Sequence, residues 1–252
     1  MERCDFLPVS AEEMHERGWW WYDALVVGGD AYVDHPSFGT AVISRVLEAE
    51  GLRVAVLAQP DWHDAEAFRA MGRPRLGVFI GAGNLDSMVA HYTAAKRRRS
   101  EDFYSPGKRS GCRPDRAAIV YCNRAREAFG PDMPIILGSL EASLRRFAHY
   151  DYWDDSVRRA ILFDAPADLL VYGMGEAATI EIAHRLKKKQ SVRTMTDIPG
   201  TGYITRDPSV CKFDHITLPS FEDVRDDKRL YAEATRTEYA EHDPIRGRAM
   251  IQ

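Results

Sequence analysis

The chain of 252 residues has only four cysteines, and none of them lies within a few residues of another. Zinc and iron–sulfur sites usually take cysteines that are closely spaced, and disulfide-stabilised secreted domains contain many more of them. The few cysteines that are present therefore indicate reduced, partly buried thiols and no metal site. They are Cys4, Cys112, Cys122 and Cys211.

The sequence also lacks a long apolar run, a secretory signal and an excess of one charge. A membrane helix needs about 20 consecutive apolar residues, and no run approaches that length. The N-terminus, Met1 to Asp5, has no apolar stretch of the kind that directs secretion. Lys and Arg number 34 and Asp and Glu 38, a net charge of −4, so no overall field attracts nucleic acid or an anionic membrane. We expect a cytoplasmic protein with neither partner.

The common nucleotide-binding and nucleophile motifs are missing as well. No GxGxxG follows the first apolar run, and the sequence contains neither GxxxxGK[ST] nor GxSxG. Asp34 and His35 are residue types that transfer protons, but adjacent side chains point in different directions. We therefore expect no catalytic residue in this chain.

Five short apolar runs alternate with helical patterns over the first two-thirds of the chain. Apolar residues make up 45% of the sequence, enough for a full core. Strands that are apolar throughout and are separated by helices form a parallel sheet covered on both faces. The predicted fold is therefore α/β, with a doubly wound, mostly parallel, five-stranded, Rossmann-like sheet. The expected strands are 22–29, 53–58, 76–81, 135–138 and 168–173, and the expected helices are 37–50, 61–71, 116–129, 155–163 and 176–189.

Glycine and polar residues follow four of the predicted strands. In open α/β sheets, ligands bind beyond the carboxyl ends of the strands, where glycine lets the backbone approach them. Alternatively, these glycines only make tight turns between strand and helix. Because parallel strands end on the same side, we expect the candidate binding residues to converge at one edge of the sheet. They are Gly28, Gly29, Asp30, Asp34, Gly81, Asn84, Gly138, Glu141, Gly173, Gly175 and Glu176.

Two further segments each have two interpretations, and a third departs from the alternating pattern. Residues 84–114 form a basic stretch that is either a functional or a mobile loop. Residues 145–155 are rich in Arg, Tyr, Trp and Asp. This composition is typical of an interface. Alternatively, the segment is a helix start capped by Asp154 or Asp155, in which nearby aspartates pair with the arginines. After residue 190 the pattern changes to a turn and strand at 198–205 and a charged helix from 218 to about 241.

Four blocks of the sequence carry a family resemblance. They are GDAYVDHPSFG at 29–39, AQPDW at 58–62, NLDSMV with HYTA at 84–94, and EASLRRFAHYDYWDD at 141–155. Together they resemble the beginning of the YgiQ family of radical S-adenosylmethionine (radical SAM) proteins. The resemblance runs from about Phe6 to the end of the chain.

This resemblance implies an N-terminal domain, similar to the cobalamin-binding fold, that precedes a radical SAM barrel. In that fold the fifth strand ends in Gly-x-Gly-Glu, which residues 173–176 match, and the fourth in Gly-Gly, from which Gly138-Ser139 departs. The family's [4Fe–4S] cluster and S-adenosylmethionine belong to the barrel, where a CxxxCxxC motif supplies three thiolates. This sequence lacks that motif. Asp34-His35 also lacks the Asp-x-His-x-x-Gly spacing that supplies histidine to cobalt, so we expect no cobalamin.

Two hypotheses follow. In the first, residues 1–195 form a Rossmann-like accessory domain and residues 196–252 an extension leading toward a barrel that is absent from this chain. The barrel of the same full-length protein is then its partner, and the chain alone is inactive and binds no cofactor. In the second, the chain is a stand-alone Rossmann-like module that binds a small molecule at the strand ends.

Overall fold

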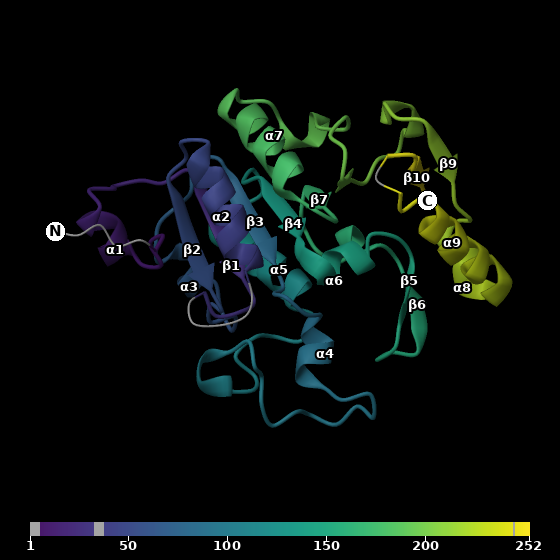
Figure 1. Cartoon of the computed structure of the whole chain (residues 1–252), viewed down its shortest axis with the longest axis horizontal. Coiled ribbons are helices and arrows are strands. Elements are labelled where there is room, and N and C mark those ends of the chain that lie inside the picture. The colour runs from purple at the N-terminus through teal and green to yellow at the C-terminus, as the bar shows by residue number, and fades with distance from the viewer. Residues whose placement is uncertain (1–5, 33–37, 244) are drawn as a thin grey trace.

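The central element is a six-stranded sheet in the order β2-β1-β3-β4-β7-β8 (Figure 1). The computed structural model describes residues 6–32, 38–243 and 245–252. The strands are β1 (Ala24–Gly28), β2 (Val54–Ala58), β3 (Gly77–Gly81), β4 (Ile135–Gly138), β7 (Leu169–Val171) and β8 (Thr201–Gly202). The first five are parallel, and β8 adds an antiparallel strand beside β7. The predicted doubly wound α/β fold is therefore confirmed, with one strand more than expected.

Helices cover both faces of this sheet. Successive side chains of a strand point to opposite faces of the sheet. On one face, α2 (Gly39–Ala49) and α7 (Glu176–Lys187) cover the strand side chains that point to them. On the opposite face, α5 (Ala117–Phe129), α3 (Glu66–Arg69) and α1 (Ala11–Glu16) contribute to a second core. None of the described helices has the length and apolar character needed to span a bilayer.

The segment after β4 differs from the prediction. A short helix, α6 (Ser139–Leu144), leads into an antiparallel hairpin of β5 (His149–Asp151) and β6 (Ser156–Arg158). The helix expected at 155–163 is wrong, and only a single 3-10 turn forms at Ile161–Phe163. The reason is local. The Asp151 carboxylate accepts hydrogen bonds from the backbone N–H groups of Trp153 and Asp154. In addition, Asp155 has a positive φ of 49°. A tight turn replaces the expected N-cap.

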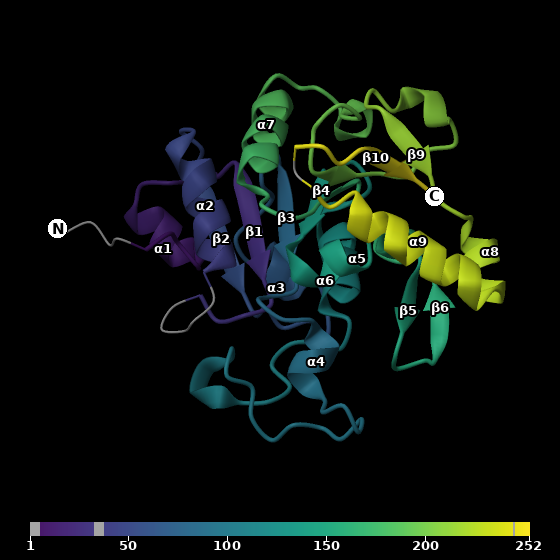
Figure 2. The same ribbon diagram turned by 45° about the vertical axis from the view of Figure 1, so that its right-hand side comes forward.

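The two C-terminal helices pack on this hairpin (Figure 2). The C-terminal residues form β9 (His215–Thr217), α8 (Phe221–Asp226), α9 (Lys228–Ala240) and β10 (Ala249–Ile251), with β9 and β10 paired in parallel. The single helix expected from 218 to 241 is divided at Asp227, whose side chain caps α9. The division of the chain at residue 195 stays a prediction, and β8 shows that both ranges contribute to one sheet.

The basic segment 84–114 is anchored to the sheet at several points. It contains α4 (Ser87–His91) and a 3-10 turn at Pro106–Lys108. Its Arg113 side chain is fully buried and forms ion pairs with Asp30 at 2.7 Å and Asp102 at 2.8 Å. The exposed cations at 96–99 therefore sit on a segment that is held in place at its far end.

Candidate functional site

Three neighbouring strands end in glycines that pair with one another. Gly28 of β1 pairs with Gly81 of β3, which in turn pairs with Gly138 of β4. Since alternate strand residues share a face, these glycines lie on the face that carries Val26 and Phe79, under α2 and α7. A row of three glycines, which have no side chain, therefore crosses the carboxyl edge of the sheet.

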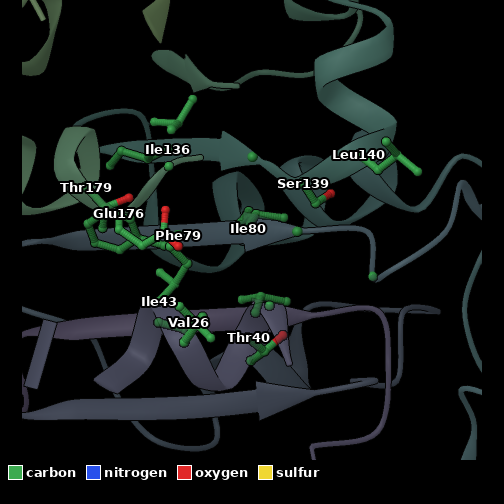
Figure 3. Close-up of a pocket in the computed structure, with 18 of the residues that line it drawn as sticks. Val26, Thr40, Ile43, Phe79, Ile80, Ile136, Ser139, Leu140, Glu176 and Thr179 are labelled. Carbon is green, nitrogen blue, oxygen red and sulfur yellow. The ribbon is translucent and has the colours of Figure 1, made fainter. Parts of the chain in front are cut away.

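A cavity of about 340 Å³ lies at this row (Figure 3). Its floor is made by the carboxyl halves of β1, β3, β4 and β7, and its walls by the first turns of α2 and α7 and by α6. This is the side of an open α/β sheet at which ligands bind, and the volume is in the range of small-molecule sites. The residues with side chains on the floor and walls include Val26, Thr40, Ile43, Phe79, Ile80, Ile136, Ser139, Val171, Glu176 and Thr179.

Four large apolar side chains around the cavity are exposed. Met174 is 86% and Phe38 68% exposed, and Val42 and Leu140 are also more than a third exposed. Clustered exposed apolar residues of this kind mark a surface that contacts a ligand or another protein segment.

The polar character of the cavity comes from neutral groups and one carboxylate. Among the described residues that line it, Glu176 is the sole charged one. Both α2 and α7 begin here, and their N-cap residues Phe38 and Gly175 make no capping hydrogen bond with a side chain. Their free N–H groups carry partial positive charge, and Glu176 offsets that charge at α7. The cavity thus offers no Lys, Arg or His to an anion from the described lining.

The candidate binding residues named from the sequence divide into two groups. Six of them line the cavity: Gly81, Asn84, Gly138, Gly173, Gly175 and Glu176. Four others lie at the same edge but do not line it: Gly28, Gly29, Asp30 and Glu141. Asp34 falls outside the residues that the structure describes.

Gly28 and Gly29 are needed for packing. A Cβ atom on Gly28 would lie 2.6 Å from the Thr40 hydroxyl, and one on Gly29 would lie 1.9 Å from the carbonyl oxygen of Ala82. Their small size lets α2 and the end of β3 approach β1.

Asp30 and Glu141 are occupied by the protein itself. Besides its ion pair with Arg113, Asp30 accepts a hydrogen bond from the backbone of Asn84. Glu141 is 2% exposed and accepts hydrogen bonds from the backbone of Ser87 at 2.8 Å and Ala118 at 3.0 Å, at the starts of α4 and α5. Burial raises the pKa of the Glu141 carboxyl. Both carboxylates therefore act here as structural links.

Ser139 is a cavity residue that was not among the candidates. Its backbone has a φ of 74°, which is rare for a residue with a side chain, and its hydroxyl accepts a hydrogen bond from the backbone of Ala82 at 3.0 Å. Strained backbone of this kind gathers at functional sites. The departure of Gly138-Ser139 from the expected Gly-Gly was the signal in the sequence.

The arginines and aspartates of the segment 145–155 pair mostly with residues outside that segment. Arg145 pairs with Asp86, which also caps α4, instead of with an aspartate of its own segment. Asp151 and Asp154 accept hydrogen bonds from Arg116, each at 2.8 Å. Of the alternatives that the sequence left open, the pairing of Arg145 with a nearby aspartate does not form, because Arg145 of the α6 end meets Asp86 at the start of α4.

A histidine–carboxylate pair lies away from the cavity. His91 Nδ1 is 2.6 Å from Asp115 Oδ1, and the Tyr92 hydroxyl donates to the same carboxylate. Although partial burial opposes it, these hydrogen bonds lower the pKa of Asp115. His91 is 1% exposed and does not line the cavity, so the pair joins α4 to the start of α5.

The three described cysteines lie in different parts of the fold. Cys112 lies in the basic segment, Cys122 is buried in α5 and Cys211 follows β8. Within the described parts of the chain, no three His, Cys, Asp or Glu side chains gather in a way that could hold a metal ion. The three thiolates that a [4Fe–4S] cluster requires are therefore not brought together by these residues.

Comparison with known proteins identifies relatives over the whole chain. A family model described as Radical SAM N-terminal matches residues 6–252. A UPF0313 protein of Clostridium botulinum strain 657 is 54% identical over all 252 residues, and one of Clostridium perfringens strain SM101 is 52% identical over the same length. The chain spans 39% and 38% of the length of these two proteins.

The solved structures that resemble the chain include radical S-adenosylmethionine methyltransferase TsrM from Kitasatospora setae. One, with tryptophan and an S-adenosylmethionine analogue bound, has a TM-score of 0.48 and 20% identity over 73% of this chain and 28% of that one. Another, with cobalamin and a [4Fe–4S] cluster bound, has a TM-score of 0.48 and 19% identity over 73% of this chain and 29% of TsrM.

Proposed function

The chain belongs to the radical SAM N-terminal family, and from this premise we propose that it is the accessory domain of a longer radical SAM enzyme of the cytoplasm. The match over residues 6–252 carries the proposal. The [4Fe–4S] cluster, S-adenosylmethionine and the radical reaction belong to the remainder of that protein, because the cysteines described here cannot supply three thiolates to one cluster. The chain alone is then not catalytic.

Iron–sulfur reconstitution tests this assignment. The 252-residue chain and the full-length protein are reconstituted in parallel under anaerobic conditions, and iron, sulfide and cluster absorbance are measured. The full-length protein should acquire a [4Fe–4S] cluster and the chain none. A stoichiometric cluster on the chain alone would contradict the proposal.

The partner in this proposal is the barrel of the same protein, and it covers the mouth of the cavity. The exposed apolar residues Phe38, Leu140 and Met174 support this contact surface. Hydrogen–deuterium exchange should reveal slower exchange at the starts of α2, α6 and α7 in the full-length protein than in the chain. Equal exchange at all three would argue against docking at this edge.

Cobalamin is not part of the proposal. No histidine occurs among the described residues that line the cavity, so the described lining supplies no imidazole to cobalt. Incubation with hydroxocobalamin followed by gel filtration should leave the chain colourless, and co-elution of the corrin absorbance with the chain would refute this point.

The cavity supports a second function within the same domain, the binding of a small molecule at the strand ends. The observation that favours it is the row of paired glycines beside a cavity of about 340 Å³. Six of the predicted binding residues line that space. Direct binding of small aromatic probes, described below, tests this function.

A further inference from the structure

We infer that the cavity takes a flat, apolar ring whose polar substituent is a hydrogen-bond donor or a cation, and that it discriminates against anions. This inference rests on the proposed ligand-binding function of the cavity. It goes beyond that function by assigning the chemical class of the ligand and the residue that selects it, Glu176.

The shape of the cavity floor indicates a flat group. Gly138 has no side chain above it: a Cβ built there would contact just two carbonyl oxygens, of Val171 at 3.6 Å and Ile80 at 4.0 Å. Gly81, on the neighbouring strand, also lacks a side chain, but the Ser139 side chain lies over it, with its Cβ 3.3 Å from the position that a Gly81 Cβ would take. A planar ring can lie against the open backbone at Gly138, because a glycine lets a ligand approach the strand closely.

The remaining surface of the cavity is mostly aliphatic and aromatic. Val26, Phe79 and Ile136 lie on three adjacent strands beneath it, and Ile43 of α2 lies on one wall (Figure 3). Burial of an apolar ring against these side chains is favourable, while a charged group moved among them would lose its hydration.

Glu176 determines the sign of the charge that is accepted. Its side chain is half-buried, and in Figure 3 it lies beside Thr179 and Phe79. It forms no ion pair with any Lys, Arg or His in the described parts of the chain. A donor or cation on the ligand would satisfy this carboxylate, and an anion would be repelled by it. At the start of α7, Glu176 also occupies the position where a phosphate would otherwise be favoured.

A series of three ligands with the same ring tests the inference. 2-Naphthylmethylamine, 2-naphthalenemethanol and 2-naphthoate are titrated into the 252-residue chain at neutral pH, and binding is followed by calorimetry. The amine should bind about tenfold more tightly than the alcohol, which corresponds to one charge-assisted hydrogen bond at a partly exposed carboxylate. The naphthoate should bind more weakly than the alcohol.

Two variants identify the residues responsible. Glu176→Gln should bring the amine and alcohol to similar affinity and improve naphthoate binding, whereas Glu181→Gln on the same helix should leave the order unchanged because Glu181 does not line the cavity. Gly138→Val should weaken all three ligands at least tenfold by filling the floor. The backbone of Gly138 is already extended, and a Cβ added there has room. The melting temperature of the Gly138→Val variant should therefore stay near that of the matched strand variant Gly202→Val.

The outcomes separate the inference from the function on which it rests. If naphthoate binds best, or if Glu176→Gln changes nothing while Gly138→Val still abolishes binding, the charge assignment is wrong and the cavity remains a binding site. If no ligand binds the chain, or if Gly138→Val binds all three as well as the unmodified chain, both the inference and the binding function are wrong.

Discussion

Replacement of Arg113 by methionine should destabilise the domain more than a change at any exposed arginine of the same segment. The Arg113 side chain is 0% exposed, and its partners Asp30 and Asp102 are 2% and 1% exposed. Its Nη1 donates to Asp30 at 2.7 Å, and its Nη2 and Nε donate to Asp102 at 2.8 and 3.1 Å. Methionine fills similar space but leaves two carboxylates buried without their cation.

The size of the effect follows from this burial. Removing one partner of a buried ion pair costs about 3–5 kcal/mol, against a total stability of about 5–15 kcal/mol for a typical domain. For a chain of this length that loss lowers the melting temperature by roughly 10 °C. The triple variant combines Arg113→Met with Asp30→Asn and Asp102→Asn. Because neutral amides leave no unpaired buried charge, this variant should recover part of the stability that Arg113→Met alone loses.

Urea denaturation followed by far-UV circular dichroism measures these differences, with Arg109→Met as the control on the exposed part of the segment. Trypsin should also cleave after the basic residues at 96–99 sooner in the Arg113→Met variant, because the segment loses one of its anchors. A loss below about 1 kcal/mol for Arg113→Met, or no recovery in the triple variant, would refute the view that this buried triad holds the segment.

Three further outcomes are expected. Burial opposes ionisation of Asp151, but hydrogen bonds from Arg116 and from backbone amides lower the pKa of this carboxyl. The stability that the ionised carboxylate contributes is therefore present above the ordinary aspartate pKa, and it is lost as the pH falls through the lowered pKa. Tryptophan fluorescence should therefore report an acid transition of the hairpin that Asp151→Asn removes, and an unchanged transition would contradict this. Burial raises the pKa of the Cys122 thiol, so mass spectrometry after iodoacetamide treatment should find it unlabelled in the folded chain while Cys112 reacts; equal labelling would be the opposite result. Arg145→Ala should cost about 2–4 kcal/mol in thermal denaturation, because it leaves a mostly buried carboxylate on α4 unpaired, and a shift near zero would place Arg145 in an interface instead.

Much of the fold could be predicted from local patterns. Each of the five parallel strands is an apolar run long enough for one strand, and burial on both faces requires such runs wherever they pair. The glycines at the strand ends were also visible in the sequence, and their common edge followed from the parallel arrangement. The hairpin at 149–158 was missed because hydrogen bonds of Asp151 to the following backbone outweighed the pattern of a capped helix.

The sequence by itself thus determined the sheet, its covering helices and the edge at which a site could form, because those depend on the spacing of apolar residues and glycine. Which polar groups at that edge are free was decided by the tertiary structure alone. Asp30 meets Arg113 across 83 residues, and Glu141 meets the starts of two helices, whereas Glu176 is left facing the cavity. The alignment of Gly81 with Gly138 likewise depends on strand register. Contacts between distant parts of a chain are set by packing in three dimensions, and no local pattern records them.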